Sequence, residues 1–223
     1  MRPMLRLRRR PPVLAEISAG PPPGAGPGAL RRGDLDAYGG LLERLDGQRT
    51  VLVTGEADDL AAAAVSLATT AAVGIATTAA AVGRQTVLVE CDLAQPRLAE
   101  ALGLATAPGM VEYLRGEAEA EALLKPVVLA GPGSGGAAGP LVCVVAGRPA
   151  ADAAELLASE RLREALERIG AAYELAVVAG PSLRRHRSLT ALMSQADATI
   201  ACLSRSNRRR KLAVPVTGLL VQG

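Results

Sequence analysis

Short apolar runs rich in β-branched residues recur along this chain, and segments with helical periodicity separate them. Runs of this kind are typical of strands buried on both faces of a sheet. They lie at residues 50–54, 86–90, 141–146, 173–179, 198–203 and 214–221. Helices are expected at 34–45, 60–83, 96–102, 110–115, 188–195 and 151–169, the last with a break near Ser159. This alternation predicts a three-layer α/β fold with a mostly parallel central sheet flanked by helices.

Composition excludes several kinds of chemistry. Of the 223 residues 49% are hydrophobic but only 1% are aromatic, so the core must be aliphatic. Nucleic-acid recognition that stacks bases on aromatic rings has almost nothing to use, and a nucleic-acid partner is therefore not expected. The three Cys form no C-x-x-C pair and there is one His. This disfavours a disulfide framework, a thiolate zinc site and a His-dependent triad, and the Cys are expected to be small buried hydrophobes.

Positive charge is concentrated in two segments. Residues 1–32 hold seven Arg and one Glu among many Pro and Gly, which predicts a flexible basic arm ahead of a single domain at 33–223. The second segment spans residues 184–211, and its arginines follow the predicted strands at 173–179 and 198–203. The carboxyl ends of these two strands share one edge of the sheet, where ligands bind in such folds. The segments could contact anionic lipid, phosphate or an acidic partner, or could simply be solvated. The second segment forms a candidate basic patch of Arg184, Arg185, Arg187, Arg205, Arg208, Arg209 and Arg210.

Targeting signals are weak. Pro and Gly, rather than an apolar run, follow the basic N-terminus, so it does not resemble a secretory signal. The uncharged stretch at 60–83 is long enough to span a bilayer, but it is dominated by Ala and Thr. A buried helix explains that stretch better. A cytoplasmic location is expected, with membrane association through a partner or through contact of the basic arm with anionic lipid.

A direct repeat lies inside the same stretch. Residues 65–72, VSLATTAA, are followed at once by residues 73–80, VGIATTAA. An eight-residue insertion lengthens a helix by about 12 Å and rotates the downstream residues by about 80°. Such an insertion would either disturb the loop ahead of the helix or form a harmless extension at the edge of the sheet.

Several segments together resemble one family. The strand–loop–helix at 50–82, the strand end Val-Glu90-Cys91-Asp92 and the segment Gln95–Leu98 are similar to bacterial tyrosine kinases of capsule and exopolysaccharide biosynthesis. These kinases belong to a larger P-loop ATPase group that includes the chromosome-partitioning and septum-positioning ATPases. The segment Gly147-Arg148-Pro149, followed by Glu-Leu-Leu-Ala-Ser-Glu-Arg at 155–161, resembles the Gly-x-x-Pro…Glu-Leu-Leu-x-Ser-x-Arg pattern of the kinases specifically. The resemblance implies a P-loop NTPase-like fold, ATP and Mg²⁺ as cofactors, and a membrane polysaccharide co-polymerase (chain-length determinant) as partner.

The phosphate-binding motif departs from that family. In a P-loop, glycine amides wrap the phosphates, Lys reaches the β- and γ-phosphates, and Ser or Thr holds Mg²⁺. Here the loop reads Thr-Gly-Glu-Ala-Asp-Asp-Leu-Ala-Ala from residue 54, and no Lys occurs between Met1 and Leu124. Carboxylates in such a loop would repel phosphate. The degenerate nucleotide-binding positions are Thr54, Gly55, Asp59 (the last Gly of the motif), Leu60 (the Lys) and Ala61, or alternatively Ala62 (the Ser or Thr).

The other two motifs are also changed. The resemblance implies two Asp at the end of the second strand that act on Mg²⁺ and the attacking group, and here these remnant catalytic positions are Glu90 and Asp92, with Asp92 the candidate metal ligand. The third motif should end in an Asp, and Ala179 stands there. Phosphoryl transfer depends on positioning and charge neutralisation, so these losses together predict a catalytically degenerate relative without a cofactor. A working tyrosine kinase or ATPase with a non-standard phosphate site is the alternative, and an electrostatic nucleic-acid binder is a third.

Overall fold

A computed structural model of the chain describes residues 11–18, 32–56, 67–127, 141–209 and 212–223. Among these residues an eight-stranded sheet has the order β1-β8-β7-β2-β6-β3-β5-β4. All neighbouring strands pair in parallel except β4 and β5, which pair antiparallel. The strands are β1 Val13–Ile17, β2 Thr50–Gly55, β3 Thr86–Glu90, β4 Lys125–Val127, β5 Leu141–Val144, β6 Leu175–Ala179, β7 Ala198–Ser204 and β8 Gly218–Gln222.

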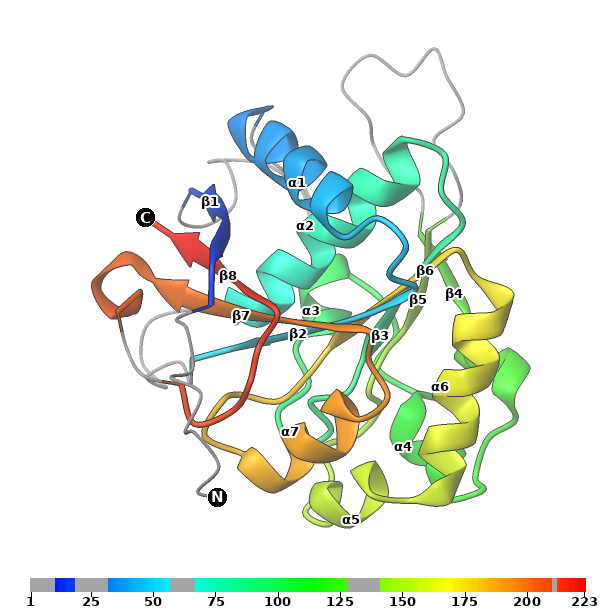
Figure 1. Ribbon diagram of the computed structural model, residues 1–223. Helices are drawn as coiled ribbons and strands as arrows, with labels where there is room; N and C mark the ends of the chain where they lie inside the picture. Colours follow the sequence, from blue (N-terminus) through cyan, green and yellow to red (C-terminus); the bar gives the residue numbers. More distant parts are fainter. Residues whose placement is uncertain (1–10, 19–31, 57–66, 128–140, 210–211) are drawn as a thin grey trace, which may run out of the picture.

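Helices cover both faces of the sheet, as Figure 1 shows. One face packs against α1 and α2, and the other packs against α4, α5, α6 and α7. The α-helices are α1 Arg32–Arg44, α2 Leu67–Ala81, α3 Leu98–Leu102, α4 Met110–Leu114, α5 Ala153–Leu157, α6 Glu160–Ala172 and α7 His186–Met193, and the short 3-10 helices are η1 Ala120–Leu123 and η2 Arg205–Asn207. The predicted three-layer α/β fold is confirmed.

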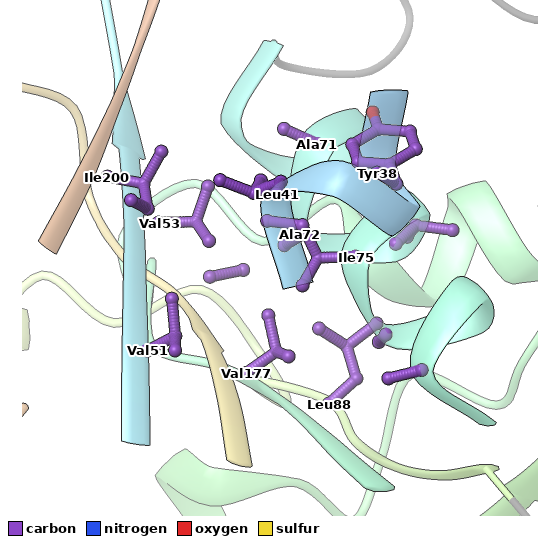
Figure 2. Packing of buried hydrophobic residues seen from close by; sticks show 14 of the residues in the cluster. Tyr38, Leu41, Val51, Val53, Ala71, Ala72, Ile75, Leu88, Val177 and Ile200 are labelled. Atoms are coloured by element: carbon purple, nitrogen blue, oxygen red, sulfur yellow. The ribbon is translucent and has the colours of Figure 1, made fainter. Parts of the chain in front are cut away.

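The helix α2 is buried on almost every side because it lies between the sheet and α1. Figure 2 shows Tyr38 and Leu41 of α1 beside Ala71, Ala72 and Ile75 of α2, with Val51 and Val177 of the sheet lower in the view. An apolar helix without a polar face requires such an environment. The helix packs on the central strands β2, β3, β6 and β7, so the described part of the repeat does not extend the edge of the sheet. Residues 60–66 of the expected helix lie outside the described part of the chain.

No helix in the described ranges combines the length and the apolar character that a membrane span needs. The expected break near Ser159 is confirmed, because α5 ends at Leu157 and α6 begins at Glu160. The Ser159 hydroxyl accepts a hydrogen bond from the Leu162 amide and so caps α6.

Two elements differ from the sequence-based expectation. The flexible arm expected over residues 1–32 contains a strand, β1, which pairs with the edge of β8. Leu14 of this strand packs where a Cβ at Gly218 would stand, so glycine permits the close approach. The antiparallel β4 was also not expected, since its three residues carry no period-2 signal. Residues 1–10 and 19–31 of the expected arm lie outside the described ranges.

Candidate functional site

Parallel pairing brings four strand ends to one edge of the sheet. Gly55 is in register with Cys202 of β7, while Val53 of β2 and Glu90 of β3 flank Ala179 of β6 on its two sides. The carboxyl ends of β7, β2, β6 and β3 therefore lie side by side. This is the edge at which an open α/β sheet binds its ligands.

Hydrogen bonds tie the end of β2 to its two neighbours. The Thr54 hydroxyl donates to the Pro181 carbonyl at 2.6 Å, and the Leu183 amide donates to the Gly55 carbonyl at 2.8 Å. The Glu56 carboxylate accepts bonds from the Ser204 amide and hydroxyl at 3.2 and 3.1 Å. These hydrogen bonds thus hold the start of the candidate phosphate loop against the segment after β6 and against the end of β7. The predicted positions Asp59, Leu60 and Ala61 lie outside the described residues.

Glu90 points its carboxylate at backbone amides. One oxygen accepts from the Arg97 and Leu98 amides at 2.5 and 2.7 Å, and the other accepts from the Ala146 amide at 3.0 Å. Burial raises the pKa of Glu90 above its usual value, against the lowering effect of these three amides. Because both oxygens already bind backbone, Glu90 ties β3 to the start of α3 and to the end of β5.

Asp92 lies two residues beyond the end of β3. One of its oxygens accepts from the Gln95 amide at 3.2 Å, and the residue is half-buried. Burial raises its pKa, while the Gln95 amide and the positive charge of Arg185 act in the opposite direction. The two side chains are not among the ion pairs within 4.0 Å in the described residues, so Arg185 acts on Asp92 through longer-range electrostatics.

The end of β6 carries no carboxylate. Ala179 is buried, and its carbonyl accepts the Cys91 amide at 2.7 Å. With Ala179 in place and Glu90 satisfied by amides, two half-buried carboxylates remain among the described residues of this edge: Asp92, and Glu56, which also accepts bonds from Ser204. Across the described ranges, no group of three or more His, Cys, Asp or Glu has the arrangement of a metal site. Mg²⁺ is usually held by one or two carboxylates together with waters and substrate phosphates, so Asp92 could serve as a ligand only in a site that phosphate and water complete.

The candidate basic patch divides into two groups. Arg205, with Ser206, Arg208, Arg209 and Glu16 of β1, lines an open groove over β1 and β8, and its guanidinium pairs with the Glu16 carboxylate at 3.1 Å. Arg185 instead acts on Asp92 at the end of β3. Arg184 and Arg187 follow β6, and neither lines the groove. That all these arginines act as one patch stays a prediction, and Arg210 lies outside the described residues.

The three cysteines are buried thiols, as expected. Burial raises the pKa of Cys143 to about 12, and it raises the pKa of Cys91 and Cys202 further. Thiols with such pKa values stay protonated at neutral pH and do not act as nucleophiles.

Comparison with solved structures places this fold. No known family model matches the chain, and no curated protein matches it in sequence. The kinase domain of the Escherichia coli tyrosine kinase Etk aligns with a TM-score of 0.71 and 16% identity over 96% of this chain and 90% of that one. The VpsO kinase domain aligns with a TM-score of 0.67 and 20% identity over 85% and 95% of the two chains.

The BceF tyrosine kinase domain gives a TM-score of 0.64 and 19% identity over 85% of this chain and 77% of that one. The fold is thus a P-loop NTPase-like α/β domain. Within that class it is similar to the bacterial tyrosine kinase domains, which confirms the resemblance seen in the sequence at the level of fold.

Proposed function

We propose that this protein is a catalytically degenerate relative of the exopolysaccharide tyrosine kinases that acts by contact rather than by phosphoryl transfer. The observation that carries the proposal is the chemistry of the strand ends. Ala179 stands at the end of β6, and both oxygens of Glu90 bind backbone amides. The adjoining loop contains neither a Lys nor a hydroxyl residue from Gly55 to Ala64. Phosphoryl transfer needs charge neutralisation at each of these positions.

The proposed partner is the cytoplasmic portion of a membrane polysaccharide co-polymerase. Support comes from the shared fold with kinase domains such as VpsO and Etk and from the basic arm at residues 1–10. Contact with the partner would hold the protein at the cytoplasmic face of the membrane, and an anionic lipid surface would add to this attraction. The role is regulatory or structural: the protein sets the state of the partner without ATP or Mg²⁺ as cofactors.

The test pairs a phosphotransfer assay with polymer analysis. The full chain is incubated with Mg²⁺ and γ-labelled ATP, and phosphate release and protein labelling are followed beside Asp92→Asn. We expect neither signal to exceed buffer. In a deletion strain, the wild type and Asp92→Asn should restore polymer length equally. Restoration by the wild type alone would contradict a role by contact.

The alternative is a working ATPase with a non-standard phosphate site. The proximity of Arg185 to Asp92 favours it, since a guanidinium can neutralise phosphate charge where the usual ammonium is missing. This alternative predicts hydrolysis by the unmodified protein that disappears in both Asp92→Asn and Arg185→Gln. An electrostatic nucleic-acid binder would instead lose affinity steeply with salt, and no observation of the structure favours it.

A further inference from the structure

A groove of about 370 Å³ lies between α4, η1 and α6, on the face of the sheet opposite α1 and α2. Figure 1 shows α4 and α6 beside each other at the lower right. Two of the three Tyr in the whole chain line this groove. Its principal wall residues are Met110, Tyr113, Leu123, Leu124, Ile169 and Tyr173. Aromatic residues and Met are enriched where proteins bind ligands, and here they gather in a chain that has almost no aromatic residues elsewhere.

The rim of the groove exposes apolar surface. Leu124 is 45% exposed, and Val13, Val82 and Leu124 are the exposed large hydrophobic residues among those described. The volume lies within the range of about 300–1,000 Å³ that is typical of small-molecule sites. The site is therefore suited to a ligand with an apolar body, such as an alkyl chain, that covers Leu124 when bound.

One wall carries positive charge. The Arg168 guanidinium lines the groove and donates a hydrogen bond to the Tyr113 hydroxyl at 2.6 Å, and the Arg161 guanidinium lies 4.6 Å from the centre of the Tyr113 ring. Neither guanidinium lies within 4.0 Å of a carboxylate among the described residues, and Glu121, the other charged residue of the lining, does not pair with Arg168. A guanidinium without a carboxylate partner beside an apolar surface attracts an anionic group.

We propose that this groove binds a small amphipathic carboxylate: an alkyl chain that lies against Leu124, Ile169 and Tyr173, with its carboxylate on Arg168. Arg168, which has no carboxylate partner among the described residues, and a lining that is apolar apart from Arg168 and Glu121 set the ligand class. A neutral chain would leave the cation unpaired, and an ammonium would meet it with like charge. The proposal is independent of the nucleotide edge, since the groove lies on other elements.

The test uses dodecanoate and the methionine methyl groups. The chain has four Met, of which Met110 lies buried behind the groove wall and Met193 lies in α7. Methyl-¹³C methionine is incorporated into the full chain, and the Met110 resonance is assigned with Met110→Leu. Dodecanoate, kept below micelle-forming concentrations, should shift the Met110 resonance saturably and leave that of Met193 in place. Dodecanol and dodecylammonium should bind at least about tenfold more weakly, because they lack the charge-assisted hydrogen bond.

Variants locate the site. Arg168→Gln should weaken the binding of dodecanoate by about tenfold and leave the binding of dodecanol unchanged. Leu124→Glu should abolish dodecanoate binding, and Val82→Glu, which replaces another exposed hydrophobic residue at the far end of α2, should bind normally. An unmoved Met110 resonance, equal binding of dodecylammonium, or unchanged binding by Arg168→Gln would overturn the proposal. Self-association of the wild type that Leu124→Glu removes in sedimentation would also overturn it, because the occupant would then be a second copy of the chain.

Discussion

Gly74 fixes the position of the repeat-bearing helix α2 against α1. A Cβ at this position would overlap the ring carbons of Tyr38, whose side chain is 1% exposed. Gly→Ala in a helix normally stabilises by about 1 kcal/mol. Here the overlap opposes that gain: overpacking costs about 1–3 kcal/mol, and expulsion of a ring that buries about 150 Å² would cost about 4 kcal/mol. We therefore expect Gly74→Ala to lower the free energy of unfolding by about 1–3 kcal/mol.

The measurement is urea unfolding followed by far-ultraviolet circular dichroism. Gly40→Ala is the matched control, because it lies in α1 and a Cβ there would meet nothing within 4 Å. That control should be neutral or stabilising by up to about 1 kcal/mol. In a Tyr38→Ala background, Gly74→Ala should also become neutral or stabilising, which gives a coupling energy of about 2 kcal/mol. If Gly74→Ala stabilises the wild type as much as Gly40→Ala does, Tyr38 does not pack on α2 at Gly74.

Three further predictions concern buried carboxylates and a helix cap. Burial acts to raise the pKa of Glu112, but hydrogen bonds from Arg148 and the Gly109 amide outweigh burial and lower that pKa. The contribution of Glu112 to the free energy of unfolding is therefore present above the unfolded pKa of about 4.3, and it is lost as pH falls through the folded pKa. In the Glu112→Gln variant, the free energy of unfolding should no longer show this decrease at acid pH. If the decrease at acid pH is the same in the variant and the wild type, Glu112 is not its cause. Burial raises the pKa of Glu90, so its contribution is complete below about pH 4.3 and is lost as pH rises through the folded pKa. The free energy of unfolding of the wild type relative to that of Glu90→Gln should therefore fall with rising pH. A difference between the two proteins that does not change with pH would contradict the raised pKa of Glu90. Ser159→Ala removes the N-cap of α6 and should lower the free energy of unfolding, measured by urea unfolding, by about 1 kcal/mol. Ser194→Ala, a control just after the end of α7, should lower it by less.

The local patterns of the sequence predicted much of the scaffold. Thr50–Gly55 and Thr86–Glu90 are apolar runs whose burial needs no knowledge of partners, and Ser159 carries its own capping signal. The strand β1 could not be predicted in this way, because its pairing depends on the space that Gly218 leaves for Leu14 some two hundred residues away.

The candidate site was predicted in position but not in contacts. The family resemblance placed Glu90 and Asp92 at the end of a strand, and β3 does end at Glu90, while their role on Mg²⁺ stays a prediction. That Glu90 binds the amides of Arg97, Leu98 and Ala146 could not be foreseen, since Ala146 is 56 residues distant and backbone amides leave no mark in the sequence. The groove likewise joins Tyr113 to Tyr173 through packing between α4 and α6, and neither residue lies in a recognisable motif.

Calorimetric titration of the full chain with ATP in the presence of Mg²⁺ decides whether this domain has lost the ability to bind nucleotide. The strand ends around Gly55 and Ala179 lack the charges that hold a triphosphate, so we expect no saturable heat. Saturable binding of Mg·ATP with submicromolar affinity would contradict the proposed loss of phosphoryl transfer.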